Sequence, residues 1–327
     1  MQRRTLLALC GAAAAVPPSA ATTRAAEDWP ARAVTIVVPF PPGGPSDIVA
    51  RIMAQPMQQA LGKPVLVENR PGATGEVGAR AVIRSAPDGH TLMHTAISTW
   101  AINAVLRPDL GYDPVRDFTP VTQTVATPPV LVANRQAVAA DDLAGVLEWL
   151  RRPGTSAAYS SSGAGSTDHM VMEMFKQRTG APVVHVPYAG GAPAVTALIS
   201  GTVQLSFQNL GSVLPHVREG RVKAVLITSA GRSPLLPGVP TAAEAGLADF
   251  VVTSWQALGG PAGMAPDLVR RVHAAAVAAL RAPDAGRRLS EIGFDVVGSA
   301  PEEFAAFQLR EIARWRRVVE AGGITAT

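Results

Sequence analysis

Two turns rich in glycine and hydroxyl groups are the parts of this sequence best suited to bind a ligand. The first, PFPPGGPSD at residues 39–47, follows a β-branched run and precedes a helical pattern. Gly43 and Gly44 let a ligand approach the backbone, and Ser46 or Asp47 would cap the helix. Free N–H groups at a helix start attract anions. This segment alone fits an anion site and an ordinary capped turn equally well.

The second turn, YSSSGAGSTDHM at residues 159–170, also lies between a short predicted strand and a predicted helix. Ser161, Gly163 and Ser166 belong to a run with more hydroxyls than a turn requires, which favours a ligand site over a plain loop. With one such turn in each of two domains, helix ends and backbone amides would face each other across a cleft. They would hold a small carboxylate without any arginine, at roughly 0.3 to 2 kcal/mol per interaction.

Motifs of common enzyme classes are absent from the sequence. There is no GxSxG, because GAGS at residues 163–166 has the wrong spacing, and neither HExxH nor a phosphate-binding loop occurs. His90 and His94 would share one face of a strand but lack a third ligand, so we predict no metal site and no cofactor. A secreted hydrolase that uses Ser166 and His169 stays an alternative, although no orienting acid is evident. His169 is better explained as a hydrogen-bonding wall residue.

The length and composition indicate a two-domain globular protein that does not bind nucleic acid. The chain has 327 residues, of which 47% are hydrophobic and 17% charged, so it can bury a sizeable core. Its net charge of +4 comes from 29 basic and 25 acidic residues, and Arg3, Arg4 and Arg24 lie in the first 26 positions. Without these arginines the charge falls to about +1, and no later basic run provides a nucleic-acid platform.

Residues 1–26 have the pattern of an export signal peptide: a basic start, an alanine-rich apolar stretch, and helix-breaking prolines before small residues. The apolar stretch is too short to span a bilayer, so we expect cleavage after export to leave a soluble mature chain. The sequence leaves open whether export follows the general or the twin-arginine route. Cys10, the one cysteine, lies in this segment, so we expect the mature protein to have no disulfide.

After the leader, short β-branched runs alternate with helical patterns, which predicts an α/β fold with largely parallel sheets. The runs begin at Val34, Val65, Thr91, Val130, Pro182, Val203 and Lys223. The last quarter is mostly helical, and Pro301 opens a terminal helix. Residues 119–130 and 250–260 are expected to cross between domains. Domain 1 would then comprise residues 27–125 plus 252–327, and the inserted domain 2 would comprise residues 126–251.

Several segments in a fixed order resemble one known family. They are WPARAVTIVVPFPPGGPSD, VENRPGATGEVGA, YSSSGAGSTDHM, HVPYAGGAPAVTALISG and LPGVPTAAEAG. The chain thus resembles the Bug-type (TctC-like) periplasmic solute-binding receptors of tripartite tricarboxylate transporters. The resemblance implies a two-lobed binding protein of the Venus-flytrap, type II-like architecture, without enzymatic activity. Such a receptor closes on a small organic acid, a mono- or dicarboxylate, in a cleft between the lobes and presents it to permease subunits in the membrane.

The resemblance also implies a set of ligand-binding residues. The first turn supplies Phe40, Gly43, Gly44 and Ser46, the second supplies Ser161, Gly163, Ser166 and His169, and the remaining wall includes Thr95, Ser98 and Tyr188. A sensor kinase is an alternative partner to the permease, because transport and sensing would use the same closed cleft.

The sequence departs from the family pattern at positions that bear on specificity. Ala189 stands where the family often has lysine, and Gln204 and Gln208 stand where it commonly has aspartate. If Gln208 faces the cleft, its amide replaces a negative charge with a neutral donor and acceptor. The far half of the ligand is therefore expected to be a second carboxylate or a neutral polar group, and an ammonium group is disfavoured.

Overall fold

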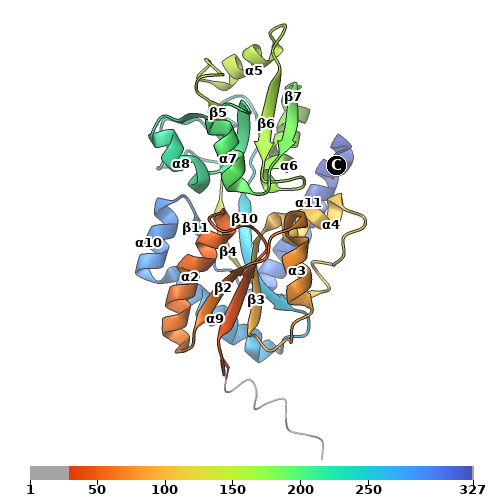
Figure 1. Cartoon of the computed structure of the whole chain (residues 1–327), viewed down its shortest axis with the longest axis vertical. Helices are drawn as coiled ribbons and strands as arrows, with labels where there is room; N and C mark the ends of the chain where they lie inside the picture. The colour runs from red at the N-terminus through yellow and green to blue at the C-terminus, as the bar shows by residue number, and fades with distance from the viewer. Residues whose placement is uncertain (1–28, 326–327) are drawn as a thin grey trace, which may run out of the picture.

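The computed structural model describes residues 29–325, which form two lobes stacked along the long axis of the molecule (Figure 1). Each lobe is built on a β-sheet with helices packed around it, which confirms the predicted two-lobed α/β class. The predicted signal peptide, residues 1–26, lies outside the described residues.

The strands of each sheet follow the β-branched runs of the sequence. The lower lobe in Figure 1 has the strand order β11-β4-β10-β3-β1-β2, and the upper lobe has the order β7-β6-β8-β5-β9. The lower strands are β1 (Val34–Val38), β2 (Val65–Asn69), β3 (Thr91–Ala96), β4 (Phe118–Thr127), β10 (Ser254–Pro261) and β11 (Asp295–Val296). The upper strands are β5 (Pro129–Asn134), β6 (Ala157–Ser161), β7 (Val183–Pro187), β8 (Leu205–Asn209) and β9 (Val222–Ile227).

Both sheets are mixed, so the prediction of largely parallel sheets was wrong. β1 is parallel to β2 and β3, and β6 is parallel to β7 and β8. β10 is antiparallel to β3 and β4, and β5 is antiparallel to β8 and β9. The chain leaves the lower lobe through β4 and returns through β10, so these neighbouring strands must run in opposite directions.

The connections between the lobes are very short. The chain enters the upper lobe at Pro128, between β4 and β5, which lies within the segment 119–130 where we expected a crossing; most of that segment is strand. On the return, the Val252 N–H still donates to the Thr228 carbonyl in the upper lobe, and Ser254 already pairs with Thr127 in the lower sheet. The domain limits at residues 27–125 plus 252–327 and at 126–251 stay a prediction.

Proline opens several of the helices, because its fixed φ suits the first helical position and its missing N–H is not needed there. The helices are α2 (Pro45–Leu61), α3 (Glu76–Ile83), α4 (Asn103–Leu106), α5 (Leu143–Arg151), α6 (Thr167–Thr179), α7 (Gly191–Ile199), α8 (Leu210–Arg218), α9 (Pro266–Arg281), α10 (Pro283–Glu291) and α11 (Pro301–Gly322). A 3₁₀ turn, η1, spans Ala73–Gly75, and a π-helical turn, η2, spans Ser98–Ile102. Within residues 29–325, no helix has the length and apolar character needed to cross a membrane.

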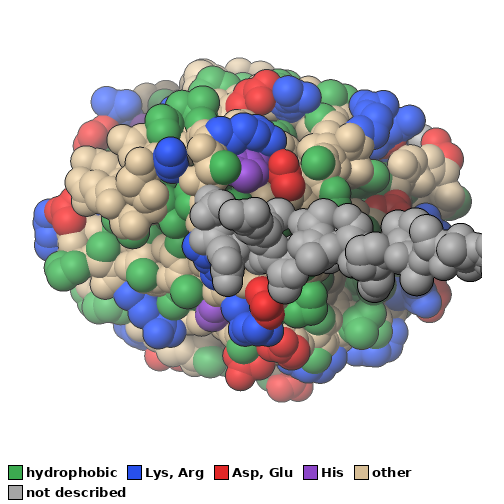
Figure 2. Space-filling model, turned by 90° about the horizontal axis from the view of Figure 1, so that it is seen from below, with side chains coloured by type: hydrophobic (Ala, Val, Ile, Leu, Met, Phe, Trp, Pro, Cys, Tyr) green, Lys and Arg blue, Asp and Glu red, His purple; other side chains and the backbone are tan. Residues whose placement is uncertain are grey.

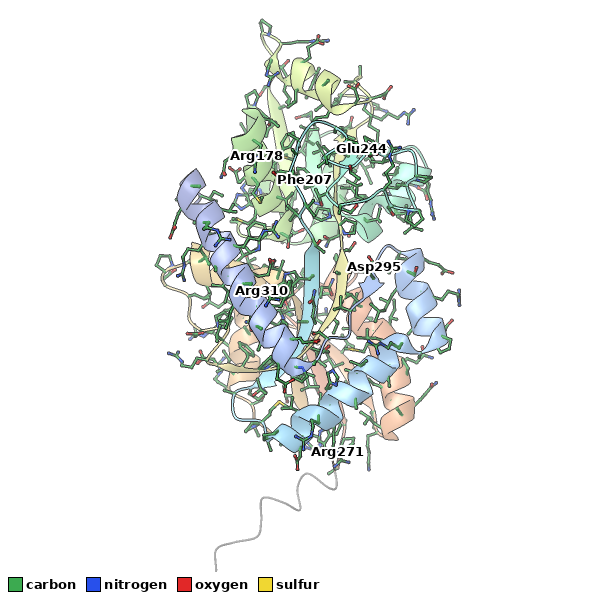
Figure 3. All side chains as sticks on the ribbon, turned by 180° about the vertical axis from the view of Figure 1, so that it is seen from behind. Arg178, Phe207, Glu244, Arg271, Asp295 and Arg310 are labelled. Carbon is green, nitrogen blue, oxygen red and sulfur yellow. The ribbon has the colours of Figure 1, made fainter. Side chains whose placement is uncertain are left out.

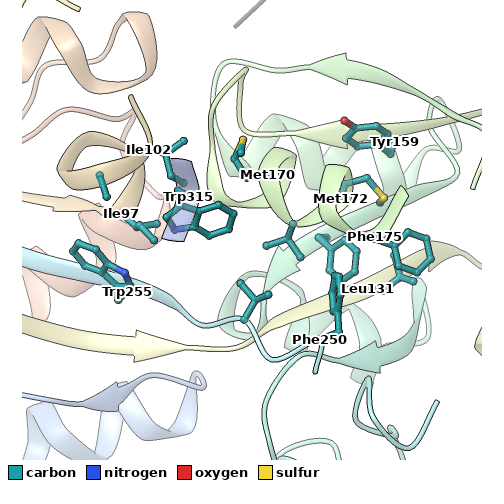
Figure 4. Packing of buried hydrophobic residues seen from close by; sticks show 14 of the residues in the cluster. Ile97, Ile102, Leu131, Tyr159, Met170, Met172, Phe175, Phe250, Trp255 and Trp315 are labelled. Atoms are coloured by element: carbon teal, nitrogen blue, oxygen red, sulfur yellow. The ribbon is translucent and has the colours of Figure 1, made fainter. Parts of the chain in front are cut away.

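A hydrophobic cluster joins the two lobes beside the crossing strands (Figure 4). It combines Leu131 and Phe175 of the upper lobe with Trp255 of β10 and Trp315 of α11, all of them buried. The indole N–H groups of Trp255 and Trp315 donate to Oε2 of Glu311 at 2.9 and 3.3 Å. In Figure 3, α11 runs along the back of the lower lobe as far as the upper lobe. This helix therefore holds the lobes together on that side.

The lower end of the molecule carries basic and acidic side chains interspersed with apolar ones (Figure 2). On this face, the described basic side chains do not form a continuous stripe. The distribution differs from the one-sided basic surface that is typical of proteins that bind nucleic acid.

We expect Trp315→Ala to lower the free energy of unfolding by about 3 to 5 kcal/mol, because it leaves a large cavity in the cluster that joins the lobes. Leu309→Ala on the same helix is the matched control, since Leu309 is 54% exposed. It should change stability by less than about 0.5 kcal/mol. Denaturant unfolding measures both values, and similar losses in the two variants would contradict this account of α11.

Candidate ligand-binding site

A cavity of about 70 Å³ lies where the two lobes meet. It has room for roughly five water-sized groups, which is the scale of a small organic acid. The lower lobe contributes Phe40, Pro41, Pro42, Gly44, Pro45, Ser46, Ala96, Ser98 and Ser254 to its lining. The upper lobe contributes Pro129, Ser162, Ser166, Thr167, Asp168, Gly190, Gly191, Ala192, Pro193, Gln208 and Asn209.

Helices from both lobes begin at the cavity wall. The N-cap residues of α2, α6, α7 and α8 are Gly44, Ser166, Gly190 and Asn209, and each of them lines the cavity. Ser98, the first residue of η2, lines it as well. The first N–H groups of a helix have no acceptor within that helix and carry its positive dipole end. The cavity therefore presents converging donors to an anion, and the described residues that line it include no lysine or arginine.

The first turn is shaped by a buried carboxylate rather than by a side-chain cap. Gly44 is the N-cap of α2, so the expectation that Ser46 or Asp47 occupies that position was wrong. Asp47 Oδ2 instead accepts from the N–H of Gly43, which has a φ of 79°. Burial would raise the pKa of Asp47, but hydrogen bonds from Arg51, Gly43 and Asn69 outweigh it and lower that pKa. The ionised carboxylate thus holds the glycine turn that precedes α2.

His94 ties the same turn to the sheet beneath it. Its Nδ1 lies 3.2 Å from the Ser46 carbonyl, and its Nε2 lies 2.9 Å from Thr124 Oγ1. Because a carbonyl only accepts, the Nδ1 proton of His94 donates to Ser46. The one Thr124 hydroxyl proton is shared between His94 Nε2 and the Gln256 carbonyl, each 2.9 Å from Thr124 Oγ1. Complete burial lowers the pKa of His94 to about 4. The ring is therefore neutral at neutral pH, and it holds Ser46 at the cavity.

The second turn brings an acidic residue to the cavity. Asp168 Oδ2 accepts from the Ser162 N–H at 2.6 Å, from the Ser162 hydroxyl at 2.7 Å and from Gln208 Nε2 at 3.2 Å. Ser166 caps α6, since its Oγ accepts from the backbone N–H of His169 at 3.4 Å. Asp168 is the one acidic side chain among the described residues of the lining, and these donors compensate its charge.

Comparison with known proteins assigns the family. Over residues 49–324 the sequence matches the family described as "Tripartite tricarboxylate transporter family receptor". The chain belongs to this family. It is a family of periplasmic solute-binding receptors rather than of enzymes, so this receptor has a ligand site and not an active site.

Relatives of the receptor match along nearly its whole length. It is 36% identical to Protein BugT of Bordetella pertussis over 324 residues, which covers 99% of each chain. Its structure resembles that of R. palustris Rpa4515 with adipate, with a TM-score of 0.87, 33% identity, and coverage of 91% of this chain and 99% of the other. It also resembles MatC from Rhodopseudomonas palustris with bound malate, with a TM-score of 0.84, 36% identity, and coverage of 89% and 100%.

The receptor brings half of the residues predicted from its sequence to the cavity wall and places the others behind it or beside it. Those in the lining are Phe40, Gly44, Ser46, Ser98, Ser166 and Gln208. Those elsewhere are Gly43, Thr95, Ser161, Gly163, His169 and Tyr188. Thr95 is fully buried, with Oγ1 3.0 Å from Thr99 Oγ1, and Tyr188 packs against a hydrophobic cluster of the upper lobe.

Behind the second turn, His169 belongs to a stack of rings, and Ser161 contacts that stack. The rings of His169 and His185 are nearly parallel, with centroids 4.1 Å apart, and the Tyr159 ring is nearly parallel to His185 with a centroid distance of 4.8 Å. Ser161 Oγ lies 2.6 Å from His185 Nε2, and His169 Nδ1 accepts from the Gly165 N–H at 3.0 Å. The contact between Ser166 and His169 is thus made by the backbone N–H of His169. This geometry does not support the Ser/His hydrolase that the sequence left as an alternative.

Several residues of the lining were missed by the sequence analysis. Gly190 and Gly191 stand in the PYAGG segment, where a glycine pair before a helix was a usable signal. Ser254 could not be found, because it reaches the site only through the pairing of β10 with β4. Gln256 lies two residues further along β10 and pairs in the sheet with Ala96, which lines the cavity. Within the described residues, neither the Oε1 nor the Nε2 atom of Gln256 has a hydrogen-bond partner. A buried amide in that position is a further candidate for contact with the ligand.

We expect acid to weaken the receptor partly through His94. Because burial lowers its pKa in the folded protein to about 4, below the unfolded value of about 6.5, the unfolded state binds the proton first as the pH falls. The stability that His94 provides is complete above pH 6.5 and is lost toward pH 4. Between pH 7.5 and 4.5 this loss is about 2 to 3 kcal/mol.

Urea unfolding at the two pH values measures this effect. His94→Gln should flatten the pH dependence by that amount, whereas the control His273→Gln, at a partly buried position of α9, should not. An unchanged pH dependence in His94→Gln would contradict the neutral, buried state of this ring.

Proposed function

We propose that this receptor captures a small organic carboxylate, a mono- or dicarboxylate, between its lobes by hinge closure and delivers it to a tripartite tricarboxylate-type transporter. The observation that carries the proposal is the convergence of the N-caps of α2, α6, α7 and α8 on a cavity whose described lining has no cationic side chain. The adipate and malate in the two structural relatives support a ligand of this class. Export by the signal peptide at residues 1–26 is part of the same proposal.

Contacts across the cleft support a closing motion. Thr74 Oγ1 of the lower lobe donates to the Ala164 carbonyl of the upper lobe at 2.9 Å. A Cβ at Gly190 would lie 3.4 Å from Pro41 Cδ, so the two lobes touch closely at the cavity rim. A ligand that binds groups of both lobes has a higher affinity for the closed form, and it therefore shifts the equilibrium toward that form. The short connections at Pro128 and before Ser254 are the natural hinge.

Permease subunits are the partner that we propose, because the family is a transporter receptor family. A sensor kinase would use the same closed form. Uptake of the ligand by cells with and without the receptor distinguishes the two roles, since only a transport partner makes uptake depend on the receptor.

We expect Gly191→Leu to abolish carboxylate binding without unfolding the protein. A Cβ at Gly191 would lie 3.5 Å from Ser162 Oγ and 3.8 Å from Gln208 Oε1, which are ordinary contacts, but the rest of a leucine side chain would fill most of the cavity of about 70 Å³. Calorimetry with a panel of organic acids should give a Kd that is micromolar or lower for at least one acid, and a loss of about 100-fold or more in the variant.

Two controls accompany this measurement. Gly286→Leu on α10 lies outside the lining and should leave binding unchanged. The amide of the bound acid should not bind, because it lacks the negative charge. If no acid of the panel binds, or if Gly191→Leu binds as the wild type does, the proposed function is wrong.

We expect Gln208→Glu to weaken dicarboxylate binding by about tenfold or more at pH 8. Gln208 Nε2 now donates to Asp168 Oδ2, so the new carboxylate would repel Asp168 and the ligand, and the pKa of one of these carboxyl groups would rise. Protonation at pH 5 should therefore restore part of the affinity. Gln204→Glu is the matched control, because the Gln204 side chain bonds Ala158 and Gly201 away from the lining. Equal affinities in the two Glu variants would show that residue 208 does not act on the ligand.

A further inference from the structure

The lobes also meet at a polar contact that lies outside the cavity. In the lower lobe it is formed by η1 (Ala73–Gly75), and in the upper lobe by residues 163–165, which belong to the turn between β6 and α6. Thr74 Oγ1 donates to the Ala164 carbonyl at 2.9 Å, and neither residue lines the cavity. We call residues 73–75 and 163–165 together the latch.

The lower half of the latch has an unusual backbone conformation. Ala73 has a φ of 45° and Thr74 a φ of 50°, in the left-handed region that is unfavourable for residues with a Cβ. Arg107 Nη1 donates to the Ala73 carbonyl at 3.1 Å, and Asn103 Nδ2 donates to the Thr74 carbonyl at 3.0 Å. These bonds to α4 and to the residue after it hold the conformation in which the Thr74 hydroxyl meets the upper lobe. Such conformations persist only where the surrounding structure fixes them, and they concentrate at ligand clamps and switch regions.

The upper half of the latch is held from its own lobe and packs against the other one. Gly165 has a φ of 76°, and its N–H donates to His169 Nδ1 at 3.0 Å. A Cβ at Gly165 would lie only 2.9 Å from Leu106 Cδ2, so the turn lies directly against α4 of the lower lobe. His169, which does not line the cavity, thus fixes the turn that accepts the hydrogen bond from Thr74.

Both halves of the latch are joined to the cavity lining through rigid elements. α4, which holds η1, continues η2 without a break, and η2 begins at Ser98 in the lining. Ser166, the residue after Gly165, caps α6 and lines the cavity from the upper lobe. Chains of packed and hydrogen-bonded elements of this kind carry energetic coupling between sites. A ligand that draws Ser98 and Ser166 together therefore also brings the two halves of the latch into contact.

We propose that the latch sets the affinity of the receptor for all of its ligands by one common factor, because it stabilises the closed form and touches no ligand atom. This inference rests on the proposed function, since a carboxylate must close the lobes for the latch to form. Thr74 is then a positioning residue. The apparent affinity of any ligand scales with the population of the form that is competent to bind it, so a weaker latch lowers every affinity equally.

Calorimetry on Thr74→Val tests the common factor. Valine has the shape of threonine but no hydroxyl, so the Ala164 carbonyl loses its donor. The loss of this hydrogen bond should weaken binding by about three- to tenfold, and by the same factor for a monocarboxylate, a short dicarboxylate and a long dicarboxylate. Thr74→Ser keeps the hydroxyl and should bind each acid as the wild type does.

Thr155→Val is the matched control, because the Thr155 hydroxyl donates to the Trp149 carbonyl within the upper lobe. It should leave all affinities unchanged. Urea unfolding of the ligand-free protein is the second measurement. Thr74→Val should unfold as the wild type does, since the open form has no latch to lose, whereas a residue with a merely structural role would lower the stability of the ligand-free protein.

The possible outcomes separate this inference from the proposed function. If Thr74→Val binds all acids as the wild type does, weakens the binding of only some of them, or destabilises the ligand-free protein, the inference is overturned. An equal loss of affinity in Thr74→Ser would overturn it as well, because the hydroxyl would then not be responsible. If no acid binds to the wild type, the proposed function itself fails.

Discussion

The meeting of helix N-termini from both lobes at one small cavity is the constraint on which the rest of the structure depends. A turn that opens a helix follows strand β1 of the lower lobe and strands β6, β7 and β8 of the upper lobe. In each lobe, these turns lie at the end of the sheet that faces the other lobe. Main-chain N–H groups supply positive potential without the cost of desolvating a lysine or arginine. Such a site needs rigid turns, and the buried groups around it provide them: Asp47 holds Gly43, and His94 holds Ser46.

The parts of this arrangement that depend on local chemistry could be predicted from the sequence. A β-branched run followed by glycine, serine and a helical pattern identified both turns, because the strand end and the helix start are neighbours in the chain. The direction of the strands could not be predicted in this way. The hydrophobic pattern of β10 is the same whether it runs with or against β4, and only the return of the chain from the upper lobe decides between them.

The same distinction between local and long-range information applies to the site residues. Ser166 and Gly44 were found because each lies in a turn rich in glycine or serine directly before a helix, although Gly44 was not the cap that we expected for α2. Thr95 was expected at the wall, yet it lies within β3, where its hydroxyl is buried against Thr99. Ser254 and Asp168 depend on long-range placement: one needs the register of β10, and the other needs Ser162 and Gln208 to compensate its charge. No local pattern carries that information.

Packing also determines how the lobes can move. The cluster that contains Trp255, Trp315 and Leu131 crosses from one lobe to the other, and close-packed side chains resist being separated. The contact between Thr74 and Ala164 is a single polar interaction that water can replace when the lobes part. In the proposed hinge closure, the lobes would therefore pivot about the hydrophobic side and open on the polar side. The packed side would then keep its contacts during the motion, and the ligand would shift the equilibrium toward closure by as much as its affinity for the closed form exceeds that for the open form.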